Sequence, residues 1–158
     1  MPRVTKIDQV DYNGCGVAAM AMVSGLTYRE AKHALFGTFP DSGRLEVSIF
    51  DLQKCLTKLG FVAKITETPA RLVKTTRMIV GMDWTGIPVL GHFVVWDPDK
   101  QRFLDPAHKR ALKYEVYVEG FKRAGKPCVA VLRRDRVVKV ELPVNTYYNS
   151  YYGSRSTW

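Results

Sequence analysis

The chain lacks most of the features that mark exported, membrane-spanning and disulfide-stabilised proteins. No apolar run approaches the ~20 residues that a membrane helix needs, and the N-terminus, Met-Pro-Arg-Val-Thr-Lys, lacks the apolar middle of a signal peptide. Only three cysteines occur among 158 residues, and they are widely spaced, which favours free thiols over a disulfide framework. We therefore expect a protein of a reducing, cytoplasmic compartment, with secretion by a non-classical route left open.

Acidic residues are scarce relative to basic ones. The 24 Lys and Arg residues against 15 Asp and Glu residues give a formal net charge of +9, which would suit nucleic acid, an anionic surface or an acidic protein substrate. The basic residues are scattered, however, and the densest groups, at 108–113 and 133–136, come with no nucleic-acid recognition motif. The distribution favours a solvated basic face over a nucleic-acid site.

Length and residue pattern indicate the fold class. With 158 residues, 46% of them apolar and 25% charged, the chain fits one soluble globular domain with a sizeable core. Helical spacing and capping residues predict three helices before residue 60: one from the Cys15 turn to Gly25, one over 27–35 and one over 48–59. The later pattern predicts strands over 61–66, 78–82, 89–96, 102–104, 128–133 and 137–142, with a further helix over 114–123. Helices followed by a mostly antiparallel sheet indicate an α+β fold.

Cys15 stands where turn-forming residues give way to an apolar, alanine-rich run. Asp11 and Asn13 are candidate caps for a helix whose interior, Val17 to Met22, is apolar on nearly every face. Cys15 then falls in the first turn, where free N–H groups and the helix dipole favour a thiolate. Glycines on both sides would let a substrate backbone approach the sulfur. The alternative is a small buried hydrophobe beside a tight turn, and the thiol alone does not decide between them.

A nucleophilic cysteine needs an imidazole partner, and the chain has three histidines. His33 falls in the second predicted helix and His108 on a basic turn, so we expect both near the surface and outside any site. His92 differs, because it lies inside an apolar strand, where an imidazole needs a partner, and because Gly91 before it leaves room for approach. A lone strand histidine is more often a core residue, but these neighbours favour a catalytic one.

A carboxylate should lie within reach of His92. The predicted turn at 97–100 would fold Asp105 back alongside His92 in a hairpin. Asp97 is the alternative, but it lies an odd number of residues from His92, so the two side chains face opposite sides of a regular strand. We therefore expect Asp105 to orient the imidazole, although a turn-forming role before proline would also explain this residue.

Gln9 is a candidate for the remaining group that such chemistry needs, a donor to the oxyanion. Its amide N–H could join the backbone N–H of Cys15, a contribution typically worth ~10²–10³ in rate, although a glutamine at this position means little by itself. Cys15, His92 and Asp105 could also supply metal ligands, but the chain has no Cys-x-x-Cys or His-x3-His pair. We expect neither a metal nor another cofactor.

These motifs resemble the papain-like cysteine peptidases, and in particular the branch of bacteriocin-processing, double-glycine-leader peptidases and their stand-alone relatives. The similar features are Gln9-x5-Cys15 at the start of a helix, Gly-His-Phe-Val-Val over 91–95 and Leu-Asp-Pro over 104–106, within a match from Ile7 to about Pro106. One departure is Asn-Gly before the thiol, where that branch has an acidic residue. The resemblance implies a helical half that carries Cys15, packed against a sheet half that carries His92, with the active-site cleft between them. It also implies Gln9 in the oxyanion hole and Asp105 as the orienter of His92.

The favoured function is a cysteine-dependent amide hydrolase that acts on a peptide or protein substrate, with no membrane partner. Glutamine deamidation or acyl transfer would use the same site, and a non-catalytic binding or assembly protein on a papain-like scaffold is the alternative from another class. We expect residues 1–142 to form the hydrolase domain. Residues 143–158 form a tyrosine-rich tail without periodicity, either flexible or docked on another chain.

Overall fold

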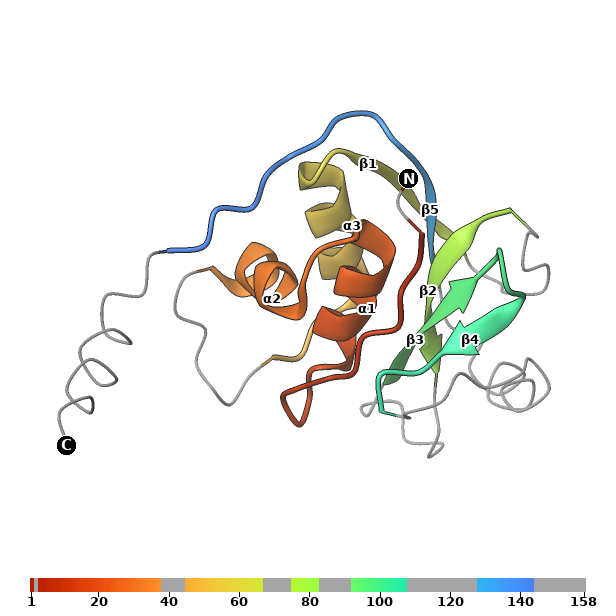
Figure 1. The fold of residues 1–158 in the computed structure, drawn as a ribbon, viewed down its shortest axis with the longest axis horizontal. Coiled ribbons are helices and arrows are strands. Elements are labelled where there is room, and N and C mark those ends of the chain that lie inside the picture. The colour runs from red at the N-terminus through yellow and green to blue at the C-terminus, as the bar shows by residue number, and fades with distance from the viewer. Residues whose placement is uncertain (2, 38–44, 67–74, 83–91, 108–127, 144–158) are drawn as a thin grey trace, which may run out of the picture.

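The computed structural model describes residues 1, 3–37, 45–66, 75–82, 92–107 and 128–143 (Figure 1). The predicted helix over 114–123, His108, and the tail from residue 144 lie outside the described residues. So do residues 89–91 of one predicted strand.

Three helices form where the sequence predicts them: α1 (Cys15–Ser24), α2 (Tyr28–Phe36) and α3 (Ile49–Lys58). The helix α1 is buried on every side from its second residue onward, as its uniformly apolar sequence predicts. Capping boxes begin the other two helices, from Thr27 for α2 and Ser48 for α3, and Gly25 closes α1 with a left-handed φ of 76°.

The predicted cap of α1 was wrong. Gly14 occupies the N-cap position, and no side chain in the described part of the chain caps the helix. Asp11 instead accepts hydrogen bonds from the Tyr28 hydroxyl, at 2.8 Å, and from the Lys32 ammonium, at 3.1 Å. The carboxylate of Asp11 therefore joins the turn before α1 to α2, because two donors on α2 outcompete the backbone N–H groups of α1.

Within the described residues, five strands form one antiparallel sheet in the order β1-β5-β2-β3-β4. They are β1 (Phe61–Thr66), β2 (Arg77–Met82), β3 (His92–Asp97), β4 (Arg102–Leu104) and β5 (Cys128–Arg134). The predicted hairpin is present as β3–β4, in a register that pairs Val95 with Leu104. Helices and an antiparallel sheet along the chain confirm the α+β class.

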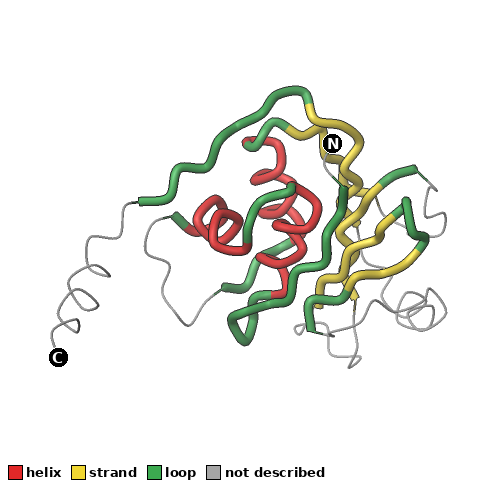
Figure 2. The backbone as a smooth tube through the Cα atoms, in the orientation of Figure 1, coloured by secondary structure: helices red, strands yellow, loops and turns green. Residues whose placement is uncertain are grey.

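The sixth predicted strand is absent. Residues 137–143 follow β5 without secondary structure (Figure 2), although their sequence alternates as a strand does. Their exposure also alternates, since Val138, Val140 and Leu142 are half-buried and the residues between them are exposed. The pattern correctly predicts the orientation of these side chains, but strand assignment also requires a hydrogen-bonded neighbour, which this segment lacks among the described residues.

The helices pack together on one side of the twisted sheet (Figures 1 and 2), and the main core fills the space between them. Alternate strand residues such as Ile79 and Val95 point into this core, and their neighbours form a second buried cluster on the other face of the sheet. The buried guanidinium of Arg77 donates to the carbonyl of Val23 at 3.0 Å, which ties β2 to the end of α1. None of the helices in the described residues is long and apolar enough to cross a membrane.

Candidate active site

Cys15 is the first residue of α1, and tight packing surrounds the two glycines beside it. A Cβ at Gly14 would lie 2.0 Å from the Tyr28 hydroxyl, and a Cβ at Gly16 would lie 2.2 Å from Cγ2 of Val47. Packing therefore favours glycine at both positions, for a reason that the local sequence does not reveal. The contacts also hold the first turn of α1 against α2 and the segment before α3, so the thiol is presented from a fixed backbone.

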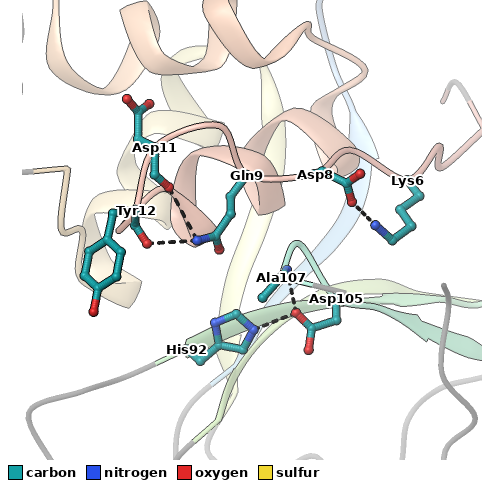
Figure 3. Close-up of polar contacts among 8 residues, drawn as sticks. All are labelled: Lys6, Asp8, Gln9, Asp11, Tyr12, His92, Asp105 and Ala107. Atoms are coloured by element: carbon teal, nitrogen blue, oxygen red, sulfur yellow. Dashed lines mark hydrogen bonds and ion pairs between the residues drawn. The ribbon is translucent and has the colours of Figure 1, made fainter. Parts of the chain in front are cut away.

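His92 and Asp105 meet across the β3–β4 hairpin. His92 is the first residue of β3, and continuing the hairpin register brings it opposite residue 107. The His92 Nε2 atom lies 2.7 Å from Oδ1 of Asp105, and the backbone N–H of Ala107 donates to the same oxygen at 2.8 Å (Figure 3). The carboxylate of Asp105 is 0% exposed, so two hydrogen-bond donors, one of them ionisable, compensate its burial.

Asp97 takes no part in this contact. It accepts a hydrogen bond from the backbone N–H of Asp99 at 3.1 Å and lies 3.8 Å from the guanidinium of Arg102. It therefore stabilises the hairpin turn at the opposite end of β3 from His92.

Cys15 and His92 perturb each other electrostatically across the two layers. Burial by itself raises the pKa of the Cys15 thiol, but a hydrogen bond with His92 and the backbone N–H groups of Phe93 and Gly16 outweigh it and lower that pKa below its ordinary value. Burial by itself lowers the pKa of His92, but hydrogen bonds with Asp105 and Cys15 outweigh it and raise the pKa to about 9. Both shifts favour a thiolate at Cys15 beside an imidazolium at His92.

Gln9 connects the segment before α1 with the segment after β4. Its backbone N–H donates to the carbonyl of Pro106 at 3.0 Å, next to Asp105. Its side-chain Nε2 donates to the carbonyl of Tyr12 at 2.8 Å and approaches that of Asp11 at 3.4 Å (Figure 3), while Oε1 is buried without a partner among the residues described. The glutamine thus shapes the turn that leads into Cys15, and its role as an oxyanion donor stays a prediction.

The support that α2 gives to this turn is not visible in the local sequence. Tyr28 donates to Asp11, and burial, followed by the nearby carboxylate of Asp11, raises the pKa of its phenol to about 12, so it remains a neutral donor. Tyr28 and Lys32 lie four residues apart on one helical face, which is the spacing that lets two side chains reach one carboxylate. That spacing is visible in the sequence, but its partner Asp11 is visible only in the fold.

The remaining cysteines and His33 lie elsewhere. Cys55 and Cys128 are buried, and burial raises the pKa of their thiols to about 11 and about 12. His33 lies in the last turn of α2, and no bond to the groups above involves its side chain in the described ranges. Among the residues that the structure describes, no group of three His, Cys, Asp or Glu side chains is placed to hold a metal ion.

The three thiols should separate clearly in an alkylation experiment. At pH 6, Cys15 of the folded protein is expected to react with iodoacetamide at least ~10²-fold faster than Cys55 or Cys128, because only its pKa is lowered. Peptide mapping by mass spectrometry after timed quenching measures all three rates in one sample. In urea, which unfolds the chain, the three alkylation rates should become similar. Equal folded-state rates at pH 6 would contradict the lowered pKa of Cys15.

Comparisons with known proteins agree with this architecture. A double-glycine motif protease from an AMS/PCAT transporter, solved with its leader peptide, matches with a TM-score of 0.55 and 19% identity over 82% of this chain and 93% of that chain. A C39-like peptidase from Bacillus anthracis matches with a TM-score of 0.54 and 16% identity over 84% of this chain and 96% of that chain. No protein-family model and no curated protein matches the sequence. The chain therefore has the fold of the double-glycine, C39-like peptidases, as the resemblance of its motifs predicts.

Proposed function

We propose that the protein is a cysteine-dependent amide hydrolase, and in the first place a peptidase. The observation that carries the proposal is the contact at 2.7 Å between His92 and the buried Asp105, together with the lowered pKa of the Cys15 thiol and the pKa of about 9 of the His92 imidazole that pairs with it. Such a pair supplies a nucleophile and a general acid at the same pH. A pure scaffold gains nothing from it, which argues against the alternative of a non-catalytic assembly protein.

The proposed first step is attack of the Cys15 thiolate on the substrate carbonyl carbon, which moves the C=O electron pair onto oxygen. Because Asp105 contacts Nε2 of His92, the ring nitrogen that serves the thiol is Nδ1. As the tetrahedral intermediate collapses, Nδ1–H protonates the departing amine and leaves a thioester on Cys15. Water, deprotonated by the now neutral His92, then attacks the thioester, releases the carboxylic acid and regenerates the Cys15 thiolate beside the His92 imidazolium.

The oxyanion would be stabilised at the N-terminus of α1. The backbone N–H of Cys15 belongs to the first turn, whose N–H groups have no partner within the helix and favour a negative charge. Gln9 would add a second donor through Nε2, whose longer contact, 3.4 Å to the carbonyl of Asp11, is the one it can release. We place the substrate in a cleft between the helical layer and the sheet.

The substrate class is inferred from chemistry and from one structural neighbour. Peptides, glutamine side chains and acyl acceptors all present a carbonyl to this pair and differ only in leaving group or acceptor. The double-glycine protease that shares the fold was solved with a leader peptide, and this supports a peptide substrate here.

An electrophilic probe for cysteine hydrolases tests the proposal. A peptidyl vinyl sulfone is expected to label the folded protein at Cys15 and to fail with heat-denatured protein, because only the fold lowers the thiol pKa. Incubation with a defined peptide mixture then separates the activities: new N-termini indicate a peptidase, and a mass gain of one dalton per site indicates a deamidase. No labelling and no product in either assay would overturn the hydrolase proposal.

A further inference from the structure

The segment after β5 is extended but unpaired within the described part of the chain. Residues 137–143 form an arc that passes over β1 and α3 along the margin of the molecule (Figure 1). Val140 packs against the main core, and the intervening residues Val137, Lys139 and Glu141 are exposed. The segment therefore has an inner apolar face and an outer face on which two opposite charges lie two residues apart.

The backbone of this segment makes no hydrogen bond to any residue that the structure describes. The last backbone bonds are those from Asp135 and Arg136 to the carbonyl of Gly60, at 2.8 Å and 3.3 Å. Water can serve the N–H and C=O groups beyond Arg136, but an extended row of such groups is also a template for another strand. The sequence has strand character, and what the segment lacks among the described residues is a hydrogen-bonded neighbour.

We propose that residues 137–143 pair antiparallel with the same segment of a second copy of this chain, about a two-fold axis at Val140. In this register Val140 lies opposite its own counterpart, Val138 lies opposite the partner's Leu142, and Lys139 lies opposite the partner's Glu141. The contact is self-complementary, because it contains two Lys–Glu pairs on the outer face and only apolar pairs on the inner face.

The charges select this register over its neighbours. An axis at Lys139 would oppose two lysines, and an axis at Glu141 would oppose two glutamates, both of which are unfavourable. An axis between two residues would pair inner side chains with outer ones and mix the faces. Only the axis at Val140 places Lys139 opposite Glu141 and also keeps inner side chains opposite inner ones.

Pro143 fits the same arrangement. It lies opposite the partner's Val137, at the end of the ladder. If the Val140 pair is hydrogen-bonded, strict alternation makes the Val137–Pro143 pair a non-hydrogen-bonded one, which needs no N–H from proline. The Lys139–Glu141 pairs then also fall at non-hydrogen-bonded positions, where opposing side chains lie closest.

Charge exchange tests this contact on the full chain by sedimentation velocity across a concentration series at fixed salt. The parent is expected to dimerise, and Lys139→Glu and Glu141→Lys are each expected to weaken the dimer about tenfold or more, because two attractive pairs become two repulsive ones. The double variant should regain the parent affinity. An equimolar mixture of the two single variants should form a heterodimer, because one chain then presents glutamate at both positions and the other presents lysine at both.

A matched control separates this contact from general charge effects. Lys100→Glu changes the net charge by the same amount at an exposed turn and should leave self-association unchanged. A parent that stays monomeric at the highest soluble concentration, or single variants that associate as the parent does, would overturn the proposal. So would a mixture of the single variants that fails to associate. Labelling of Cys15 is independent of these outcomes, so the hydrolase proposal stands or falls separately.

Discussion

Cys15→Ala is expected to lower kcat/KM for peptide hydrolysis by at least ~10⁴-fold, to the limit of detection, because no other group in the proposed mechanism can form the thioester. The fold should survive, because Cys15 is only partly buried and alanine is a good helix former in the first turn of α1. Progress curves with a peptide substrate measure the rate, and circular dichroism with thermal melting checks the fold.

Cys55→Ala is the matched control for this substitution. It also replaces a cysteine by alanine in a helix, but Cys55 is buried on α3 and its thiol pKa is raised to about 11. Its activity should stay within about twofold of the parent, with only the small loss of stability expected for removing a buried sulfur. If Cys15→Ala hydrolysed the peptide at the parent rate, another group would be the nucleophile and the mechanism would be contradicted.

His92→Ala is expected to lower kcat/KM by ~10³-fold or more, because it removes both the general acid and the main stabiliser of the thiolate. Without the imidazole, the burial that raises the pKa of Cys15 is opposed only by backbone N–H groups, so alkylation at pH 6 should also slow. His33→Ala removes a histidine from α2, away from the thiol, and should change neither rate.

The pH dependence of the parent's activity provides an independent check of the role proposed for His92. Activity should rise as the Cys15 thiol loses its proton, below the ordinary thiol range, and fall as His92 loses its proton at about pH 9. In His92→Ala the descending limb at about pH 9 should vanish. A variant that keeps the parent profile would show that another group is the acid.

Much of the fold could be predicted from the sequence because the local signals agree with the packing. The capping boxes at Thr27 and Ser48 and the left-handed glycine after α1 are short-range devices, and each is read from a few neighbouring residues. The β3–β4 hairpin is equally local, since a proline-containing turn fixes its register. This local register is what places Asp105 against His92.

Other features were not predictable, because they depend on contacts between distant segments. The engagement of Asp11 by α2 cannot be read from the turn itself, and it overrides the cap that the local sequence suggests. The packing of Val47 against Gly16 likewise joins residues that no short motif connects. The absence of a strand partner for residues 137–143 among the described residues depends on which segments lie nearby, and alternation along one segment does not report this.

The two side chains of the proposed catalytic pair begin their respective elements, Cys15 at the start of α1 and His92 at the start of β3. They belong to different layers of the fold and are far apart along the chain, so closing the loop between them costs entropy that local structure cannot offset. During folding, helices and hairpins can form before the sulfur and the imidazole meet. The newly made chain therefore carries a thiol with an ordinary pKa until the two layers dock. The lowered pKa of Cys15 is a property of the completed fold.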